Sequence, residues 1–370
     1  MNFCLLNIVL SLILSAYLAG FVIPQILLIA FRKNLFDEPD ERKIHTSLVP
    51  RLGGLAFTPV IFLTLSFLVG INTSCGFDAI LNDAAGSLQS LSYLICAVIL
   101  LYLVGIGDDL IGIRYKAKFF VQIVCGILLL AGGVYLKHFQ GFCGIGSLPL
   151  VFAYPFTILL VVFVINAVNL IDGIDGLASG LSSVAFLFYG IIFYLMHHYT
   201  DALLSFSALG VLVPFFYYNV FGDAEKHKKI FMGDTGSLTI GMLLCFLSLR
   251  LSMIDKYDFN YSLNPLALAY SPLIIPCLDV IRVYMGRVKK GKNPFLPDKT
   301  HIHHKLLAVG MQQRMAMVTI ILVSILFTLI NIVLSPYLNI TFLLVFDISI
   351  WTLGNIWLTR KEKRMCENKD

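Results

Sequence analysis

The sequence predicts an all-α, polytopic integral membrane protein, a helical bundle with about eleven transmembrane helices. Three observations support this fold class. Of the 370 residues, 58% are hydrophobic and 13% are charged, and the mean hydropathy of +0.86 is far above that of soluble domains. Apolar stretches of roughly 20 residues, the length that crosses a bilayer, recur along nearly the whole chain. Because backbone polar groups must be satisfied internally in lipid, these stretches are expected to be helices.

The predicted spans are 3–31, 53–71, 90–106, 118–136, 150–166, 177–196, 202–221, 237–251, 265–284, 315–335 and 338–358. The first apolar run is too long for a signal peptide and shows no clear cleavage site, so we expect it to be retained. No internal repeat or low-complexity linker divides the chain, and residues 1–370 are treated as one domain.

The distribution of Lys and Arg predicts the orientation. If the 32–52 loop is cytoplasmic, the loops on its side of the membrane hold 23 of the 27 Lys and Arg residues. Positive residues accumulate on the cytoplasmic side, so the N-terminus is predicted outside and the C-terminus in the cytoplasm. The formal net charge of +5 reflects this asymmetry, and nothing indicates binding to nucleic acid.

The polar motifs fall on this same predicted side. They are DEPDERKIHTSLVPRLGG (37–54), GDDLIGIRYKAK (107–118), NAVNLIDGIDGLASG (166–180), FMGDTGSL (231–238) and PDKTHIHHKL (297–306). The outward loops are short and hold nothing comparable. One face of the protein is therefore predicted to carry the chemistry.

Asp108 and Asp109 end the third predicted span. Two adjacent carboxylates at the C-terminal end of a helix are unfavourable with the helix dipole. We therefore expect a cation beside them, either a metal ion or the side chains of Lys116 and Lys118. A helix end exposed to water is an equally good interpretation of this pair alone.

Asn166, Asn169, Asp172 and Asp175 recur every third residue. On a helix they would form one slowly drifting stripe that faces a single neighbour, and Gly173 beside it would let a ligand come close. Such groups at a membrane boundary indicate function, unless they serve as polar contacts between helices. Their carboxylate and amide oxygens suit a hard cation such as Mg²⁺, completed by substrate phosphates.

Two further motifs add an acid and three imidazoles. Asp234 precedes an apolar span, where a helix N-terminus would welcome an anion, although a simple N-cap explains the pattern equally well. His301, His303 and His304 lie among lysines, and their spacing does not match a helical zinc site. Contact with phosphate, or with anionic lipid headgroups, remains open for them.

Together these groups predict a site for a divalent ion and for phosphates with direct access from the bilayer. Positioning and charge neutralisation of this kind suit phosphoryl transfer to a lipid acceptor. A transporter is the alternative, since acids within helices also mark conduction paths. Acids of a transporter would lie near the bilayer midplane and recur in two halves, a pattern that this sequence does not show.

In this order the motifs resemble those of the polyprenyl-phosphate N-acetylhexosamine-1-phosphate transferases. The resemblance extends over about residues 37–306, and RKIHTSLVPRLGG also matches the first cytoplasmic loop of that family. The His301-Ile302-His303-His304 sequence resembles the bacterial undecaprenyl-phosphate GlcNAc-1-phosphate transferase branch. The phospho-MurNAc-pentapeptide translocases, which have three adjacent histidines, are the alternative branch.

The resemblance implies transfer of a sugar 1-phosphate from a UDP-N-acetylhexosamine, with N-acetylglucosamine favoured, to undecaprenyl phosphate. UMP would be released, and a cell-surface polysaccharide such as O-antigen, capsule or a teichoic acid linkage unit would be started. The resemblance also implies Mg²⁺, with Mn²⁺ as a substitute, and an active site on the cytoplasmic face of the bacterial inner membrane. A homodimer is one assembly open to such a protein.

The resemblance further assigns roles to individual residues. Asn169 and Asp234 would hold the metal ion on the donor pyrophosphate. Asp108 and Asp109 would lie where the lipid phosphate attacks. A role for Asp108 as the base is one alternative, but that phosphate is largely ionised at neutral pH, so direct attack is favoured. Asp109 would orient Lys118 or the metal ion.

Substrate contacts are assigned to the nucleotide and to the phosphates. Phe231 would stack on the uracil, and Lys43 and His45 would close over the nucleotide. The donor phosphates or sugar would be contacted by His301, His303 and His304. Asp172, Gly173 and Asp175 would border the uridine. Lys118 would contact phosphate, with Lys116 as its near substitute, and Asn166 and Arg282 complete the substrate-binding set.

Overall fold

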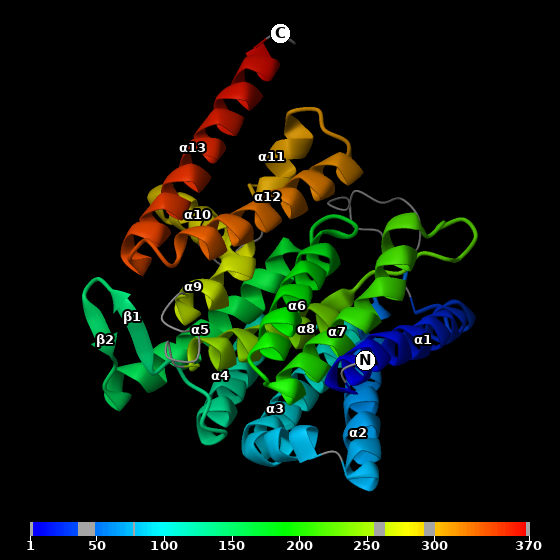
Figure 1. The fold of residues 1–370 in the computed structure, drawn as a ribbon. Helices are drawn as coiled ribbons and strands as arrows, with labels where there is room; N and C mark the ends of the chain where they lie inside the picture. The colour runs from blue at the N-terminus through cyan, green and yellow to red at the C-terminus, as the bar shows by residue number, and fades with distance from the viewer. Residues whose placement is uncertain (1–2, 36–48, 77, 255–262, 292–299, 368–370) are drawn as a thin grey trace.

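The computed structural model describes residues 3–35, 49–76, 78–254, 263–291 and 300–367 (Figure 1). Lys43 and His45, which were predicted to close over the nucleotide, lie outside these ranges. The described chain is a bundle of helices with one small two-stranded hairpin at its edge (Figure 1). This architecture confirms the all-α membrane fold class.

The α-helices of the described ranges are α1 (Phe3–Arg32), α2 (Phe57–Cys75), α3 (Asp78–Ile111), α4 (Tyr115–Ala131), α5 (Leu150–Ile171), α6 (Leu177–Leu195), α7 (Tyr199–Phe216), α8 (Gly233–Ser252), α9 (Pro265–Tyr270), α10 (Ile274–Lys289), α11 (Ile302–Ala308), α12 (Gln313–Leu334) and α13 (Ile340–Glu367). Shorter helical turns are η1 (Gly53–Ala56), the π-helical η2 (Tyr217–Phe221) and η4 (Ser271–Leu273). The hairpin consists of strands β1 (His138–Phe142) and β2 (Ile145–Ser147), which pair antiparallel.

Within the described residues, ten helical segments are long and apolar enough to cross a membrane, and they correspond to ten of the eleven predicted spans. The remaining span, 118–136, corresponds to α4, whose 17 residues are at the lower limit for crossing. This helix ends at Ala131 because two glycines follow, and Gly133 has a φ of +74° that terminates the helix.

Two features differ from the predicted spans. The predicted span 265–284 consists of α9, η4 and α10, because Pro272 and Pro276 lack the N–H donors that a continuous helix requires. The β1–β2 hairpin falls in a loop that was predicted to face outward and for which no strand was predicted. Gly141 and Gly144 adopt positive φ at its turn.

Helix α8 lies in the middle of the bundle (Figure 1). In the most apolar stretch of α8, 89% of the residues are buried. The buried share in the corresponding stretches of the other nine candidate spans ranges from 28% to 61%. Close packing depends on small residues: a Cβ on Gly241 would lie 2.9 Å from Cα of Ile165 on α5. Because α8 is central, the first turn of this helix is surrounded by the ends of its neighbours.

The described parts of the predicted polar loops come together at one end of the bundle. Helices α3 and α5 end there, α4, α6 and α8 begin there, and α10 leads toward α11. Backbone N–H groups of Gly53 and Gly54 donate to the carbonyl oxygens of Phe231 and Met232, both over 2.9 Å. These bonds fasten the first loop to the segment that precedes α8. The cytoplasmic identity of this end remains a prediction from the charge distribution.

Candidate active site

Three carboxylates meet where α3 ends and α8 begins. One oxygen each of Asp108, Asp109 and Asp234 lies within 4.8 Å of the others, and all three residues are half-buried. Asp108 and Asp109 lie in the last turn of α3, and Asp234 lies in the first turn of α8. The structure thus brings together acids that the sequence places in two separate motifs.

Lys118, in the first turn of α4, bridges two of these acids. Its Nζ lies 2.6 Å from Oδ2 of Asp234 and 2.8 Å from Oδ2 of Asp108. The three side chains are only 16–24% exposed, so this network is shielded more strongly than a surface ion pair. Lys116 is exposed and pairs with none of the described acids. Of the two lysines expected beside Asp108, Lys118 is therefore the one that reaches it.

Asp109 caps the N-terminus of α8. Its Oδ1 accepts a hydrogen bond from the backbone N–H of Asp234 over 2.7 Å. Its Oδ2 accepts from the backbone N–H and the hydroxyl of Thr235, over 3.0 and 2.6 Å. A carboxylate is favourable at this positive end of a helix dipole. Both oxygens are thereby committed, and Asp109 orients the turn that carries Asp234 rather than contacting Lys118.

Two glycines allow this cap to form. A Cβ on Gly105 would lie 2.4 Å from Cα of Thr235, and a Cβ on Gly54 would lie 2.0 Å from the backbone nitrogen of Gly236. Both distances are far inside atomic contact, and the clashing atoms belong to backbone that cannot move aside. Glycine at these positions lets α3 and the first loop approach the start of α8.

Asn169 connects α5 to the same centre. Its Nδ2 donates to Oδ1 of Asp234 over 3.2 Å and to the hydroxyl of Ser237 over 2.8 Å. Asn166, one turn earlier, is not brought to the acids. Its amide donates to Oε1 of Gln122 on α4 over 2.6 Å, which is the polar contact between helices that the sequence left open.

The expected helical stripe is wrong beyond Ile171, because α5 ends there and Asp172 and Asp175 lie in the turn that leads into α6. Gly176 adopts a φ of +77° in this turn, a conformation that favours glycine and ends the stripe. Asp175 nevertheless reaches the site, where its Oδ2 lies 2.6 Å from Nζ of Lys229.

The resemblance assigns Asp175 and Phe231 to the uridine, and Lys229 joins them. The ammonium group of Lys229 lies 5.8 Å from the centre of the Phe231 ring, a cation–π distance. The ring itself is half-buried, and the backbone carbonyl of the same residue accepts the hydrogen bond from Gly53. This cluster presents an aromatic face beside a charged pair.

Asp172 reveals the electrostatic character of the site. Asp172 is exposed, and the neighbouring protein removes only part of the water around its carboxylate. This desolvation, followed by repulsion from Asp234 and Asp175, raises the pKa of Asp172 to about 7, whereas Arg51 acts in the opposite direction. An excess of carboxylates of this kind favours the binding of a cation.

Helix α11 carries His303 and His304, and His301 is the residue directly before it. His303 is buried against Gly173, where a Cβ would lie only 2.2 Å from the His303 Nε2. The rings of His301 and His303 are parallel to within 6°, with centroids 5.8 Å apart. The ring centroids of His303 and His304 are 4.2 Å apart. Burial, with the neighbouring His304 and His301, lowers the pKa of His303 to about 3, so this ring is neutral. His303 therefore packs α11 onto the 172–176 turn.

Arg282 joins the histidine helix through an acid that the sequence analysis missed. This acid is Asp279 on α10, which accepts hydrogen bonds from Arg282 and from His301. Its signal was present in the sequence, since an acid within an apolar span indicates function by default. Arg51 and Lys229, which act on Asp172 and Asp175, were missed as well, although both lie in or beside predicted motifs.

The donor set fits a hard divalent cation. The carboxylates of Asp108 and Asp234 and the amide of Asn169 offer the oxygen ligands that Mg²⁺ and Mn²⁺ prefer. The donors lie in the last turns of α3 and α5 and the first turn of α8, at the boundary of the spans rather than at their middle. This position suits a site that meets a water-soluble and a lipid substrate, and it disfavours a conduction path.

Comparisons with known proteins agree with this geometry. The model of glycosyl transferase family 4 matches residues 91–252. A Yersinia pestis protein named undecaprenyl-phosphate alpha-N-acetylglucosaminyl 1-phosphate transferase is 33% identical over 308 residues, 82% of this chain and 78% of that protein. A Salmonella typhi protein of the same name is 32% identical over 301 residues, 80% and 75% of the two chains.

A relative from Bacillus subtilis extends the comparison. A Bacillus subtilis protein named probable undecaprenyl-phosphate N-acetylglucosaminyl 1-phosphate transferase is 30% identical over 340 residues, 90% of this chain and 86% of that protein. The family match runs from within α3 to the end of α8 and includes the acids, Lys118 and Asn169. By its match to the family model and its similarity to these relatives over most of its length, the chain belongs to glycosyl transferase family 4.

Proposed function

We propose that this protein transfers N-acetylglucosamine 1-phosphate from UDP-N-acetylglucosamine to undecaprenyl phosphate and releases UMP. The names of the relatives support the acceptor and the transferred group. The observation that carries the proposal is the convergence of Lys118, Asp108 and Asp234, beside Asn169, at the boundary end of the bundle. Such a site can hold a diphosphate and a membrane-bound phosphate together.

The reaction forms one bond and breaks one. An oxygen of the lipid phosphate attacks the β-phosphorus, which carries the sugar, and the bond from this phosphorus to the bridging oxygen breaks. The electron pair leaves with UMP. The attacking phosphate monoester is largely dianionic at neutral pH, so no residue has to remove a proton from it.

The residues of the chain serve mainly to hold and neutralise phosphates. Asp234 and Asn169, with Asp108 beside them, would hold Mg²⁺, which neutralises the charge that develops on the phosphate oxygens. Lys118 is placed to bind a phosphate oxygen as a point charge. Asp109 fixes the turn that presents Asp234, and so acts through that residue.

The nucleotide would bind over the half of the site that contains Asp175, Lys229 and Phe231. Phe231 offers a ring for stacking on uracil, and Lys229 holds Asp175 beside it. We place the site on the cytoplasmic face of the bacterial inner membrane, because 23 of the 27 Lys and Arg residues lie on that side in the predicted topology.

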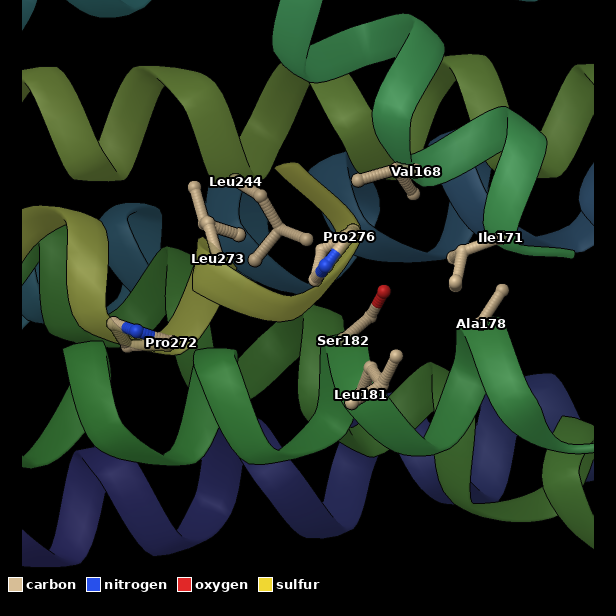
Figure 2. Close-up of a pocket in the computed structure, with 9 residues that line it drawn as sticks. All are labelled: Val168, Ile171, Ala178, Leu181, Ser182, Leu244, Pro272, Leu273 and Pro276. Atoms are coloured by element: carbon tan, nitrogen blue, oxygen red, sulfur yellow. The ribbon is translucent and has the colours of Figure 1, made fainter. Parts of the chain in front are cut away.

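A small apolar pocket lies next to the polar turn, and its volume of about 10 Å³ is too small to hold an isoprene unit of the acceptor. It lies between α5, α6, α8 and the interrupted η4–α10 segment (Figure 2). Its α5 wall includes Ile171, which is directly followed by Asp172 of the polar turn. The pocket is lined by Val168, Ile171, Ala178, Leu181, Ser182, Leu244, Pro272, Leu273 and Pro276.

The experiment is an assay of the purified full-length protein with Mg²⁺, undecaprenyl phosphate and a panel of UDP-sugars. We expect UMP release and a lipid-linked product with UDP-N-acetylglucosamine. UDP-MurNAc-pentapeptide serves as the control donor, and product from that donor alone would assign the chain to the translocase branch. Product from neither donor would overturn the proposed function.

A further inference from the structure

Asp279 is a fully buried acid on α10, between the apolar residues Leu278 and Val280. A carboxylate in such surroundings must be compensated by hydrogen bonds or by positive charge. Donors from two separate segments supply this compensation. Oδ1 accepts from Nη2 of Arg282 over 2.7 Å, and Oδ2 lies 2.9 Å from Nδ1 of His301.

A backbone donor completes the arrangement. The N–H of Ile302 donates to Oδ1 of Asp279 over 3.1 Å and to Oδ2 over 3.3 Å. Arg282 also donates from Nη2 to the carbonyl oxygen of Thr300 over 2.6 Å. The start of α11 is thus tied to α10 through one carboxylate and its arginine.

This arrangement fixes the protonation of one nitrogen of His301. An ionised carboxylate offers only acceptors, so Nδ1 of His301 must carry a proton to bond with it. The other nitrogen, Nε2, is then the hydrogen-bond acceptor of the neutral ring. The ring of His301 lies parallel to that of His303, which in turn packs on Gly173 beside Asp172.

We infer that Asp279 is a positioning residue of the transfer site: it fixes the tautomer of His301 and the direction of Arg282, so that both meet the phosphates of the nucleotide-sugar. This inference rests on the proposed function. Asp279 itself touches no substrate and acts through the other two side chains. The relationship is the one by which a buried carboxylate orients a catalytic or metal-binding imidazole in other sites.

A second buried pair of the same chemistry provides the matched control. Oδ2 of Asp201 accepts from Nε and Nη2 of Arg250 over 3.0 and 2.8 Å, and Asp201 is 1% exposed. Arg250 lies in the last turn of the 20-residue α8 and Asp234 in its first, which separates them by about 25 Å. Breaking this pair removes a buried ion pair without touching the histidine helix.

The test is a double-mutant cycle on transfer from UDP-N-acetylglucosamine, measured with the full-length protein. Asp279→Asn should lower kcat/KM for the donor by roughly 10- to 100-fold, mainly through KM. In a His301→Ala background the same change should cost clearly less, because its main target is already gone. Asp201→Asn should lower the melting temperature but change the donor kcat/KM less than twofold.

Equal losses for Asp279→Asn in both backgrounds would overturn the positioning role and leave the proposed function standing. An inactive wild-type protein would overturn both. If Asp279→Asn does not fold, Asp279→Glu keeps the charge and displaces it by one methylene. This variant should still raise the donor KM in the wild-type background, and an unchanged donor KM would reject the inference.

Discussion

The ammonium group of Lys118 lies 2.6 Å from Oδ2 of Asp234, although 116 residues separate the two in the chain. The same ammonium group lies 2.8 Å from Asp108, so one lysine links α3, α4 and α8 at the centre of the site. A divalent cation bound by Asp108 and Asp234 would compete with Lys118 for their oxygens. Lys118 would then be released toward the phosphates of the substrates.

Lys118→Met should therefore have opposite effects on ion binding and on transfer. Removing a positive charge a few ångströms from the ion should tighten Mn²⁺ binding, by about tenfold after screening. Transfer should fall, because a phosphate loses its cationic partner. Mn²⁺ binding followed by electron paramagnetic resonance, together with UMP release, measures both effects.

Lys116→Met is the control for that pair of measurements, since Lys116 is exposed and lies two residues away on the same helix. It should alter neither Mn²⁺ affinity nor turnover appreciably. Weaker Mn²⁺ binding in Lys118→Met would contradict the competition between the ammonium group and the ion.

Asp234→Ala should lower transfer by more than about 100-fold while the protein still inserts and folds. Asp234 is half-buried at a helix start, and the cap on this helix is provided by Asp109 rather than by its own side chain. Asp223→Ala, in the loop that precedes α8, is the control and should retain full activity. Near-normal turnover by Asp234→Ala would remove this residue from the site.

Gly173→Ala should separate the histidine helix from the acidic turn. The new Cβ would lie 2.2 Å from Nε2 of His303, so the imidazole or the turn must shift. A displacement of about 1 Å at a site of this kind can cost roughly 100-fold in rate. The donor kcat/KM measures this loss, and the melting temperature should change by only a few degrees.

Gly286→Ala on α10 is the matched substitution, because a Cβ there meets nothing within 4 Å and alanine favours the helix. Activity in this variant should equal that of the wild type. Wild-type activity in Gly173→Ala would show that the contact between His303 and this turn does not matter for transfer.

His303 predicts a specific loss of stability in acid. In the unfolded chain an imidazole takes up a proton below about pH 6.5, whereas burial holds the pKa of His303 in the folded protein at about 3. The contribution of His303 to the free energy of unfolding is therefore complete above about pH 6.5, and it decreases as the pH falls toward 3. At pH 5 the wild type should have lost roughly 2 kcal/mol from this residue.

The measurement is the melting temperature of the wild type and of His303→Asn between pH 7.5 and 5. Asparagine does not titrate in this range, so the variant should lose less stability than the wild type as the pH falls. Parallel curves for the two proteins would show that His303 is not held neutral by its surroundings.

The sequence predicted the helical spans well, because their length and apolar composition are local properties that the bilayer imposes. It also placed the acids, Lys118 and the histidines on one face. The residues alone left the choice between Lys116 and Lys118 open, and only the resemblance favoured Lys118. Both lie in the first turn of α4, and packing against α8 decides which reaches Asp234. Local composition does not determine that packing.

Two other misses have the same physical origin. The end of α5 at Ile171 depends on a turn through glycines, and a spacing of three residues continues across it without interruption. Asp279 and His301 meet across 22 positions of sequence that include residues outside the described ranges. Contacts that depend on the tertiary structure cannot be predicted from the spacing of residues in the sequence. An acid within an apolar span, such as Asp279, nevertheless indicated a functional residue.

The central claim is that the protein transfers a sugar phosphate rather than a sugar, at the site formed by Lys118 and the acids of α3 and α8. The most direct measurement uses UDP-N-acetylglucosamine labelled with ³²P at the β-phosphate, undecaprenyl phosphate and Mg²⁺. The account predicts that the label enters the lipid fraction with the wild type and that Asp234→Ala abolishes this transfer. Label that stays in the aqueous fraction while the sugar moves to lipid, or equal labelling by Asp234→Ala, would contradict it.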